Sequence, residues 1–392
     1  MERSMRTWKS AAAMTLAVSV ITVVTVAADD QPAPAPTAAP SAAPSPEPSP
    51  EAAPPAGPAP IEVTGFVDTY YGYNFNKPPV DTQLRNFDTK HNQLSFGLLE
   101  VALEQKPTTK NRLGFRADLD YGPTTDIVHA AEPGGSDIFK AFEQGYLSWL
   151  APVGKGLQFD AGKFVTLAGA EVIETKDNWN YSRSLLFALA IPYYHMGVRA
   201  TYNVNDKVAL AGYLVNGWND AVDNNSGKTI AFQAVVKPHP KLSVVANFIG
   251  GPEQKSDTAD KRYLWDGVVT FNATPALSLM VNYDYGKDRI AGVPMRWQGV
   301  AAYARYQVIP TWAVTPRVEW VDDKDAFMTG TSQTLKEFTI TSENKIDGGL
   351  LARLEFRRDM SDVPFFLKEG GATVKGQNTF TVGLVYGFGT RF

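Results

Sequence analysis

The sequence has no cysteine, only four histidines and only one long apolar stretch. The absence of cysteine excludes a disulfide scaffold, a thiolate zinc site and a cysteine nucleophile. The single apolar stretch, Ser10–Ala28, excludes a multi-span helical membrane protein, because each span needs about 20 apolar residues. A formal net charge of -4 without a run of Lys or Arg argues against nucleic acid as a partner.

The apolar stretch has the layout of a secretory signal peptide. Arg3, Arg6 and Lys9 precede it, and it ends at Val26-Ala27-Ala28, which suits cleavage after Ala28. We therefore expect residues 1–28 to be a cleaved signal peptide. The alternative is an uncleaved anchor helix.

Residues 29–60 are rich in proline and alanine and do not have the composition of a packed domain. Between Gln31 and Pro60, 12 of 30 residues are Pro and 10 are Ala. Proline fixes φ and lacks the N–H donor, so we expect an extended, semi-rigid periplasmic linker. A plain linker and a tether that contacts the cell wall both fit this composition.

The remainder, residues 61–392, alternates apolar and polar side chains with a period of two, which predicts strands with one apolar face. In the segment 112–121, for example, the odd positions are apolar and the even positions are Arg, Gly or Asp. We expect about 16 such strands, with 14–18 compatible with the pattern. Most are near the length of about 9–11 residues that a membrane-crossing strand needs, rather than the 5–6 typical of soluble sheets.

The connections between these segments alternate between long and short. We expect the long ones at 77–92, 122–139, 165–194, 217–227, 251–261, 286–295, 323–334 and 360–376. Such segregation is typical of a transmembrane up-and-down antiparallel β-barrel, which has tight turns at one rim and loops at the other. The predicted fold class is therefore all-β, an outer-membrane barrel. Pro316 falls inside the expected strand 312–322, so we expect either a bulge there or a strand with other bounds.

The last expected strand, 377–388, alternates apolar residues up to Phe388, and Phe392 keeps the same parity. A terminal aromatic residue that closes an alternating strand is typical of barrels inserted by the outer-membrane barrel-assembly machinery. We therefore expect Phe392 to be the contact with that machinery, and the surrounding outer-membrane lipid to be the other partner of this strand.

This barrel predicts a measurable assembly behaviour. The mature chain should fractionate with the outer membrane and should migrate differently on gels when unheated, because a closed barrel has no edge from which to unravel. Deleting Phe392 should lower the amount of assembled barrel without changing the pore of the barrels that form. Full solubility of the mature chain in detergent-free buffer would contradict the barrel and would favour a soluble secreted β-protein.

Four segments carry a resemblance to a known family: Gly162–Phe164, Asn178–Ser184, Val215–Asn219 and Arg353–Asp359. With them, residues 61–392 resemble the OmpL-like outer-membrane β-barrel porins. The resemblance implies a porin, with a water-filled channel for passive diffusion of ions and small hydrophilic solutes. It implies no particular solute, and it does not cover the proline-rich linker.

The polar faces of the strands would line the lumen of such a barrel, which at this size is wide enough for water. Fixed charges beside a narrow water path determine which ions and solutes enter. The predicted lumen-facing charges are Arg112, Arg116, Asp118, Asp120, Asp284, Arg353, Glu355 and Arg357. The alternative is that most of them only solvate the lumen and pair with one another.

The longest connection, 165–194, combines charges with apolar residues such as Ile173, Trp179 and Phe187. It is too apolar to remain wholly in water, so we expect it to fold into the lumen. Our hypothesis is that its charged residues form the pore constriction. These residues are Glu171, Glu174, Lys176, Asp177 and Arg183.

No catalytic or cofactor-binding motif is recognisable. The four histidines are scattered near loops, and the acidic group Asp220, Asp223, Asn224 and Asn225 is typical of a solvated loop rather than a Ca²⁺ site. We expect no enzyme activity, no cofactor and no metal. A non-channel barrel for attachment, with its lumen plugged by loops, and a barrel enzyme are the alternatives. The oligomeric state is left open, a homo-oligomer included.

Overall fold

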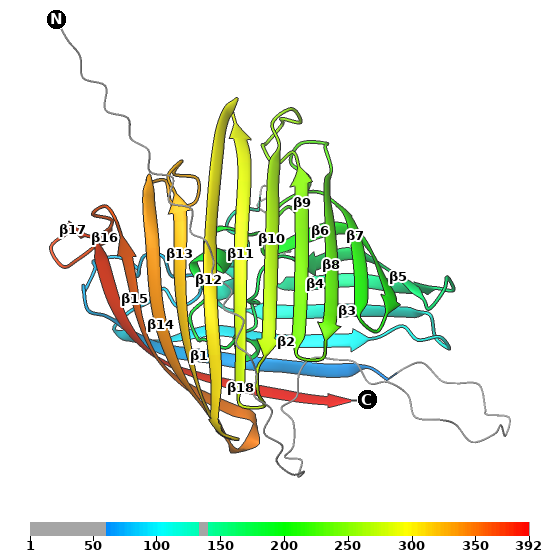
Figure 1. Cartoon of the computed structure of the whole chain (residues 1–392), viewed down its shortest axis with the longest axis horizontal. Coiled ribbons are helices and arrows are strands. Elements are labelled where there is room, and N and C mark those ends of the chain that lie inside the picture. The colour runs from blue at the N-terminus through cyan, green and yellow to red at the C-terminus, as the bar shows by residue number, and fades with distance from the viewer. Residues whose placement is uncertain (1–59, 133–139, 392) are drawn as a thin grey trace, which may run out of the picture. The chain divides into compact units, whose positions relative to one another are not determined.

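The computed structural model describes residues 60–132 and 140–391. In this part of the chain, sixteen strands form one closed antiparallel barrel, in which the last strand pairs with the first (Figure 1). The predicted fold class is thus confirmed. The barrel strands are β1 (Glu62–Asn74), β2 (Gln93–Gln105), β3 (Leu113–Tyr121), β4 (Phe142–Ala151), β5 (Leu157–Val165), β6 (Tyr194–Asn205), β7 (Val208–Val215), β8 (Thr229–His239), β9 (Leu242–Gly251), β10 (Arg262–Asn272), β11 (Leu277–Ile290), β12 (Val293–Ile309), β13 (Trp312–Asp323), β14 (Gln333–Ile346), β15 (Leu350–Ser361) and β18 (Gly376–Arg391).

The remaining elements are short and lie in the connections. They are α1 (Pro123–Val128), η2 (Thr175–Asp177), α2 (Leu185–Leu189), η3 (Asp347–Gly349) and the small hairpin β16 (Phe366–Leu367) and β17 (Thr373–Val374). None of the helices in the described residues is long and apolar enough to cross a membrane.

Burial alternates along the strands as the sequence pattern predicts. In β15, Leu354 is 45% exposed, whereas its neighbours Arg353 and Glu355 are each 1% exposed. The apolar residues of a strand therefore lie on the outer surface of the barrel, and the polar residues point inward. Trp312 and Trp320, near the two ends of β13, both lie on the outer surface.

The two rims of the barrel differ in the length of their connections. The short-turn rim carries the connections 106–112, 152–156, 206–207, 240–241, 273–276, 310–311 and 347–349. The long-loop rim carries 75–92, 122–141, 166–193, 216–228, 252–261, 324–332 and 362–375, together with one tight turn. All but one of the predicted long connections are therefore found.

The exception is the predicted long connection 286–295, which is wrong. There β11 and β12 continue as a paired hairpin up to Ile290 and Val293, joined only by Ala291 and Gly292. Both turn residues have positive φ, 50° and 79°, as a tight hairpin turn requires. The apolar pattern stops earlier because this end of the hairpin carries charged residues on its outer side. Figure 1 shows β11 and β12, in yellow, extending to the top of the barrel wall.

The bulge predicted at Pro316 is also not found. Pro316 pairs in register with Ile340 of β14. On its other side, the ladder between β12 and β13 pairs Tyr303 with Arg317 and Tyr306 with Val314, without a shift between these pairs. Because proline has no N–H donor, the ladder between β12 and β13 is interrupted beside Pro316, but the register of the two strands does not change. The irregularity of this strand pair lies between Gln307 and Ile309 instead.

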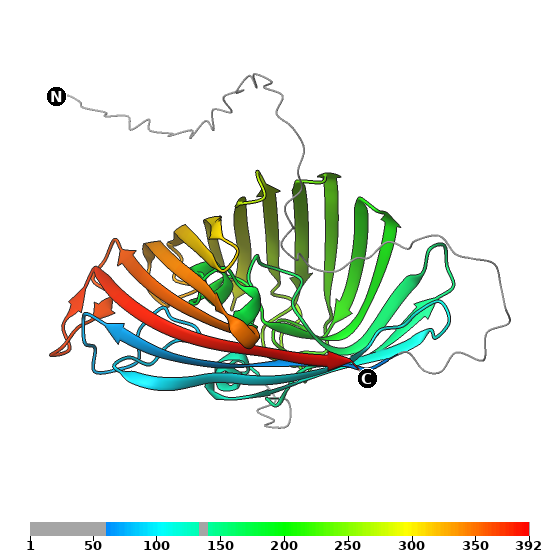
Figure 2. The same cartoon turned by 90° about the horizontal axis from the view of Figure 1, so that it is seen from below.

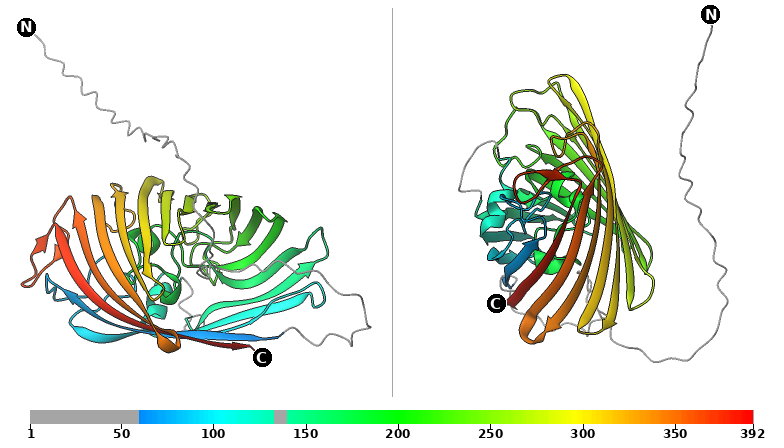
Figure 3. Two further views of the ribbon diagram at one scale, coloured as in Figure 1. Left: turned by 60° about the horizontal axis from the view of Figure 1, so that its bottom comes forward. Right: turned by 90° about the vertical axis from the view of Figure 1, so that its left-hand side faces the viewer.

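The apolar core of the molecule lies inside the barrel, around α2. Leu185 and Leu186 are fully buried there and belong to the same cluster as the inward-facing Phe66, Trp297 and Val321 of the wall. Figures 2 and 3 show this helical segment, in green, within the ring of strands. The connection 166–193 therefore lies inside the barrel.

Three expectations fall outside the described residues. They are the cleaved signal peptide 1–28, the linker 29–60 except for Pro60, and the assembly role of Phe392. These stay predictions.

Candidate functional site in the barrel lumen

The connection 166–193, which we call the lumen loop, starts at β5 and crosses the barrel to the wall formed by β13, β14 and β15. Glu355 of β15 accepts hydrogen bonds from the backbone N–H groups of Tyr181 and Ser182, at 2.7 and 3.0 Å. Asn180 donates to the Thr315 carbonyl at 3.1 Å and to the Thr341 hydroxyl at 2.7 Å. The loop is thus bound to the wall through its backbone N–H groups and through the side-chain amide of Asn180.

Arg317 of β13 is the central cation of this contact. Its side chain is fully buried, and Nη1 lies 2.9 Å from Glu171 Oε1 and 2.7 Å from the Ser182 carbonyl oxygen. Its Nε lies 3.2 Å from Glu337 and 3.4 Å from Glu319. One arginine is therefore paired with three buried carboxylates, two from the wall and one from the loop.

Two arginines of β15 extend the contact along the strand. Arg353 donates to the carbonyl oxygens of Thr175 and Asn178, both at 2.6 Å, and pairs with Glu343. Arg357 donates to the Arg183 carbonyl oxygen at 2.6 Å. Because a guanidinium has five donors in a fixed plane, each arginine can bind the wall and the loop backbone together.

The helix α2 and the ring of Tyr181 in the loop also pack closely against the wall. Ser184 caps α2 by accepting from the Phe187 N–H, and Glu319 accepts from the Leu185 N–H at 3.0 Å. Two glycines of the wall leave space for the loop: a Cβ at Gly299 would lie 2.6 Å from Leu186, and one at Gly383 would lie 2.2 Å from the Tyr181 ring. Larger residues at these positions would displace the loop.

The structure divides the five predicted constriction residues into two groups. Glu171 and Arg183 are buried and hold the loop together. Glu171 accepts from the Ser184 N–H at 2.6 Å in addition to its pair with Arg317. Arg183 donates to the carbonyl oxygens of Val172, Ile173 and Tyr181. Burial lowers the pKa of the Arg183 guanidinium.

The other three residues lie on a less enclosed part of the loop. Lys176 and Asp177 form an ion pair with each other, and their side chains are 28% and 55% exposed. Glu174 is more buried, and this burial raises the pKa of its carboxyl group. The two groups share one loop, and the most exposed of the five charged side chains are Lys176 and Asp177.

The wall on the side of β2, β3 and β4 is acidic. It presents four buried, inward carboxylates, from Glu100, Asp118, Asp120 and Glu143. In the part of the chain that the structure describes, the carboxylates of Asp120 and Glu143 have no hydrogen-bond partner. Arginines of β13 and β15 fix the loop to that side of the barrel, whereas the wall of β2, β3 and β4 presents carboxylates to it.

A cavity of about 310 Å³ lies between the lumen loop and the wall of β6, β7 and β8. Glu171 and Glu174 line it from the loop, and Arg199 lines it from the wall. Arg199 is held by Asp160 at 2.8 Å and lies about 4.9 Å from the ring of Tyr146. Charges of both signs therefore face one cavity that is large enough for several water molecules.

Apart from Arg112, the predicted lumen-facing charges lie on the inward side of the strands, and most of them are paired and buried. Arg116 pairs with Asp118 at 2.9 Å, and Arg353, Glu355 and Arg357 bind the lumen loop. Arg112 precedes β3 at the short-turn rim and donates to the Leu150 carbonyl oxygen. The remaining two, Asp120 and Asp284, are buried in the wall.

Sequence reasoning missed three wall residues that contact the loop, Arg317, Glu319 and Asp68. It also missed Glu337 and Glu343, which pair with the arginines that hold the loop. Asp68 of β1 accepts from the Tyr181 hydroxyl at 2.8 Å and from the Thr175 hydroxyl at 2.7 Å. A signal was present, since Arg317 and Glu319 alternate with the outward Val318 and Trp320.

A second connection, 75–92, covers the lumen loop from the long-loop rim. Phe87 packs edge-on against Phe187, with ring centroids 6.1 Å apart, and Tyr193 donates to Asn86 at 2.8 Å. Arg357 reaches the Leu84 carbonyl oxygen at 3.3 Å. The two loops therefore narrow the lumen together.

The histidines form hydrogen bonds that hold the local structure. In residues 60–132 and 140–391 they are hydrogen-bonded to backbone groups, to the Thr166 hydroxyl and to Lys163 Nζ, and to no serine or carboxylate. His129 lies 2.5 Å from Lys163, and burial lowers its pKa to about 4. Within the same residues, no group of three His, Cys, Asp or Glu has the geometry of a metal site.

Comparison with known families decides the identity of this barrel. Residues 60–388 match the model of the family described as beta-barrel porin-2, OmpL-like. The chain belongs to this porin family. The predicted family is thus confirmed, and membership assigns the barrel a channel role in the outer membrane. No curated protein matches the chain.

Solved structures with the same fold as this porin are distant in sequence. OmpT of Vibrio cholerae, in a trimer form, is 13% identical, with a TM-score of 0.58 over 84% of this chain and 100% of that one. The anion-selective porin of Comamonas acidovorans is 11% identical, with a TM-score of 0.55 over 84% and 99%. The outer-membrane channel DcaP of Acinetobacter baumannii is 13% identical, with a TM-score of 0.54 over 84% and 97%. At these identities the likeness shows the fold alone.

Proposed function

We propose that this porin passes ions and small hydrophilic solutes by passive diffusion, and that the lumen loop sets the narrowest point of the path. The observation that carries the proposal is the seating of the loop across the lumen by Arg317, Arg353 and Glu355. The cavity beside Arg199, Glu171 and Glu174 supports it, because it leaves space on the side opposite the anchors.

Within this proposal, the five constriction residues have different tasks. Glu171 and Arg183 keep the loop in place, because both are buried in its fixed part. Glu174, Lys176 and Asp177 act on permeating ions, because Glu174 lines the cavity beside the loop and the side chains of Lys176 and Asp177 are partly exposed. In a narrow passage of low dielectric constant, such charges act on an ion more strongly than charges at an exposed rim.

Reversing two of these charges should change ion selectivity. In the double variant Glu174→Lys and Asp177→Lys, the reversal potential in a salt gradient should shift toward anions, because two carboxylates beside the path become ammonium groups. The matched control is Asp81→Lys with Glu369→Lys, which makes the same charge change at exposed positions of the long-loop rim. Equal shifts in the two variants would place Glu174 and Asp177 outside the constriction.

The dense packing of the lumen loop and of 75–92 favours one second candidate, a non-channel barrel for attachment. Such a barrel would insert in the membrane and conduct no ions. For the channel, we propose no enzymatic role, no cofactor and no metal. Within the described residues, no histidine is hydrogen-bonded to the serine or acid that hydrolysis would require.

We also propose the targeting and assembly of the chain. A signal peptide 1–28 is removed, a linker 29–60 remains in the periplasm, and the barrel 61–392 is inserted through Phe392. The trimer form of the structurally similar OmpT supports a homo-oligomer of this porin. Chemical cross-linking of the detergent-extracted protein, followed by gel electrophoresis, tests the oligomer directly.

A further inference from the structure

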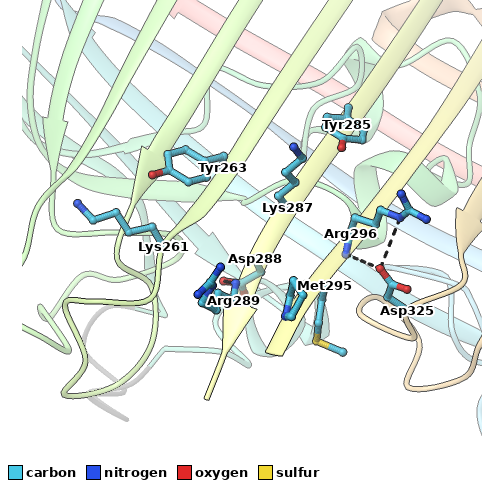
Figure 4. Close-up of a pocket in the computed structure, with 10 residues that line it drawn as sticks. Lys261, Tyr263, Tyr285, Lys287, Asp288, Arg289, Met295, Arg296 and Asp325 are labelled. Carbon is cyan, nitrogen blue, oxygen red and sulfur yellow. Dashed lines mark hydrogen bonds and ion pairs between the residues drawn. The ribbon is translucent and has the colours of Figure 1, made fainter. Parts of the chain in front are cut away.

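The extended β11–β12 hairpin carries an outward row of cations that the channel does not use. Lys287 of β11 pairs directly with Tyr263 of β10 on one side and with Arg296 of β12 on the other. These three residues have the outward parity of their strands. They line a surface pocket of about 570 Å³, together with Lys261, Arg289 and Tyr285 (Figure 4).

The charge of this pocket is largely uncompensated. Of its two acids, Asp288 points inward and pairs with Arg262 at 2.8 Å. Asp325 is the acid on the outer side, and Arg296 Nε lies 3.7 Å from it, as Figure 4 shows. In the described part of the chain, the side chains of Lys261, Lys287 and Arg289 form no ion pair. The pocket therefore offers several free donors to an anion.

The position of the pocket along the barrel indicates where that anion comes from. One residue pair below the cationic row, toward the middle of the barrel, lie Trp265 and Tyr285, which pair with each other. Further along the same outward face lie Val269 and Val281, again directly paired. The order of cation, aromatic and aliphatic residues matches the order of headgroup, interface and hydrocarbon in a membrane.

We propose that this pocket binds the phosphate groups of a phosphorylated glycolipid in the outer leaflet of the outer membrane. Lys287 and Arg296 contact the phosphate, Tyr263 and Tyr285 pack at the level of the sugar headgroup, and the acyl chains lie along the apolar face below. Because the long-loop rim of such barrels faces the outside of the cell, the lipid belongs to the outer leaflet. Basic pockets at this depth recognise anionic headgroups by charge and donor geometry.

The test is a binding titration of the detergent-solubilised full chain with lipopolysaccharide. We expect the double variant Lys287→Gln and Arg296→Gln to bind roughly thirtyfold more weakly, as expected for the loss of two cations at an anionic headgroup. The matched control is Lys336→Gln with Arg358→Gln, which removes two outward cations from β14 and β15. The control should bind as the unchanged protein does. The gel shift of unheated samples verifies that both variants are folded.

Three results would overturn the proposal. Equal affinity of the two double variants would show general attraction to the rim rather than a site in the pocket. Displacement of the lipid by inorganic phosphate at similar concentration would assign the pocket to a free anion, since phosphate lacks the sugar and acyl contacts. A changed oligomeric state of the pocket variant with unchanged lipid binding would assign the face to a second copy of the chain. None of these readouts depends on ion conduction.

Discussion

Deleting Val172–Ser184 is expected to raise the single-channel conductance several-fold. The deletion removes the part of the lumen loop that Arg353, Glu355 and Arg317 hold across the lumen. The two ends of the deleted segment lie near each other, because the Glu171 side chain accepts a hydrogen bond from the Ser184 N–H at 2.6 Å. The wall charges that lose their partners would then face water, where their solvation costs little.

A matched control separates the loss of the loop from the general effect of a deletion. Removing Glu369–Gly371 shortens the tip of the β16–β17 hairpin, where Lys368 and Ala372 are already hydrogen-bonded at 2.9 Å. This variant should conduct as the unchanged protein does. Conductance in planar bilayers is the measurement. If the Val172–Ser184 deletion assembles and conducts no better than the control, the lumen loop does not limit the path.

The substitution Arg317→Met should release the loop without shortening it. It leaves Glu171, Glu319 and Glu337 buried without their shared cation, and breaking a buried ion pair in this way typically costs about 3–5 kcal/mol. We expect the barrel to unfold at a lower temperature and at a lower urea concentration. We also expect a larger and noisier conductance, because the freed loop can move away from β13–β15.

The control for this prediction is Arg116→Met. Arg116 is also an inward arginine, paired with Asp118 at 2.9 Å, but its ion pairs are with β2 and β3 and not with the loop. Its loss should destabilise the barrel less and should leave the conductance noise unchanged. Barrel stability is measured as the temperature at which samples lose the gel mobility of the folded barrel. Conductance noise is measured by bilayer recordings. Identical behaviour of the two variants would remove Arg317 from its role as the main anchor.

The barrel could be predicted from the sequence because strand patterning is local. Every second residue of a membrane strand faces lipid, so each short segment shows by its alternation which residues face outward and which face the lumen. The same rule failed at 286–295, where the β11–β12 hairpin extends with charged residues on its outer side. It failed at Pro316 too, because a long, well-paired strand absorbs one missing hydrogen bond without a bulge.

The site could be predicted only in part. Length and apolar content indicated that the connection near residues 165–194 would fold onto the protein, and its contacts with β13–β15 place it inside the barrel. The partners of the loop could not be derived, because they come from strands more than 100 residues away, as in the pair of Glu171 with Arg317. Glu319 and Glu337 alternate with outward residues as the other inward charges do, so nothing in the local sequence distinguishes them as partners of Arg317.

Single-channel recording of the unchanged protein in planar bilayers tests the central claim most directly. We predict stable, ohmic conductance steps from the folded barrel, and a reversal potential in a salt gradient that depends on Glu174 and Asp177. A preparation that shows the gel shift of a closed barrel but produces no conductance steps would contradict the channel. It would then favour the attachment barrel whose lumen is filled by the lumen loop and by 75–92.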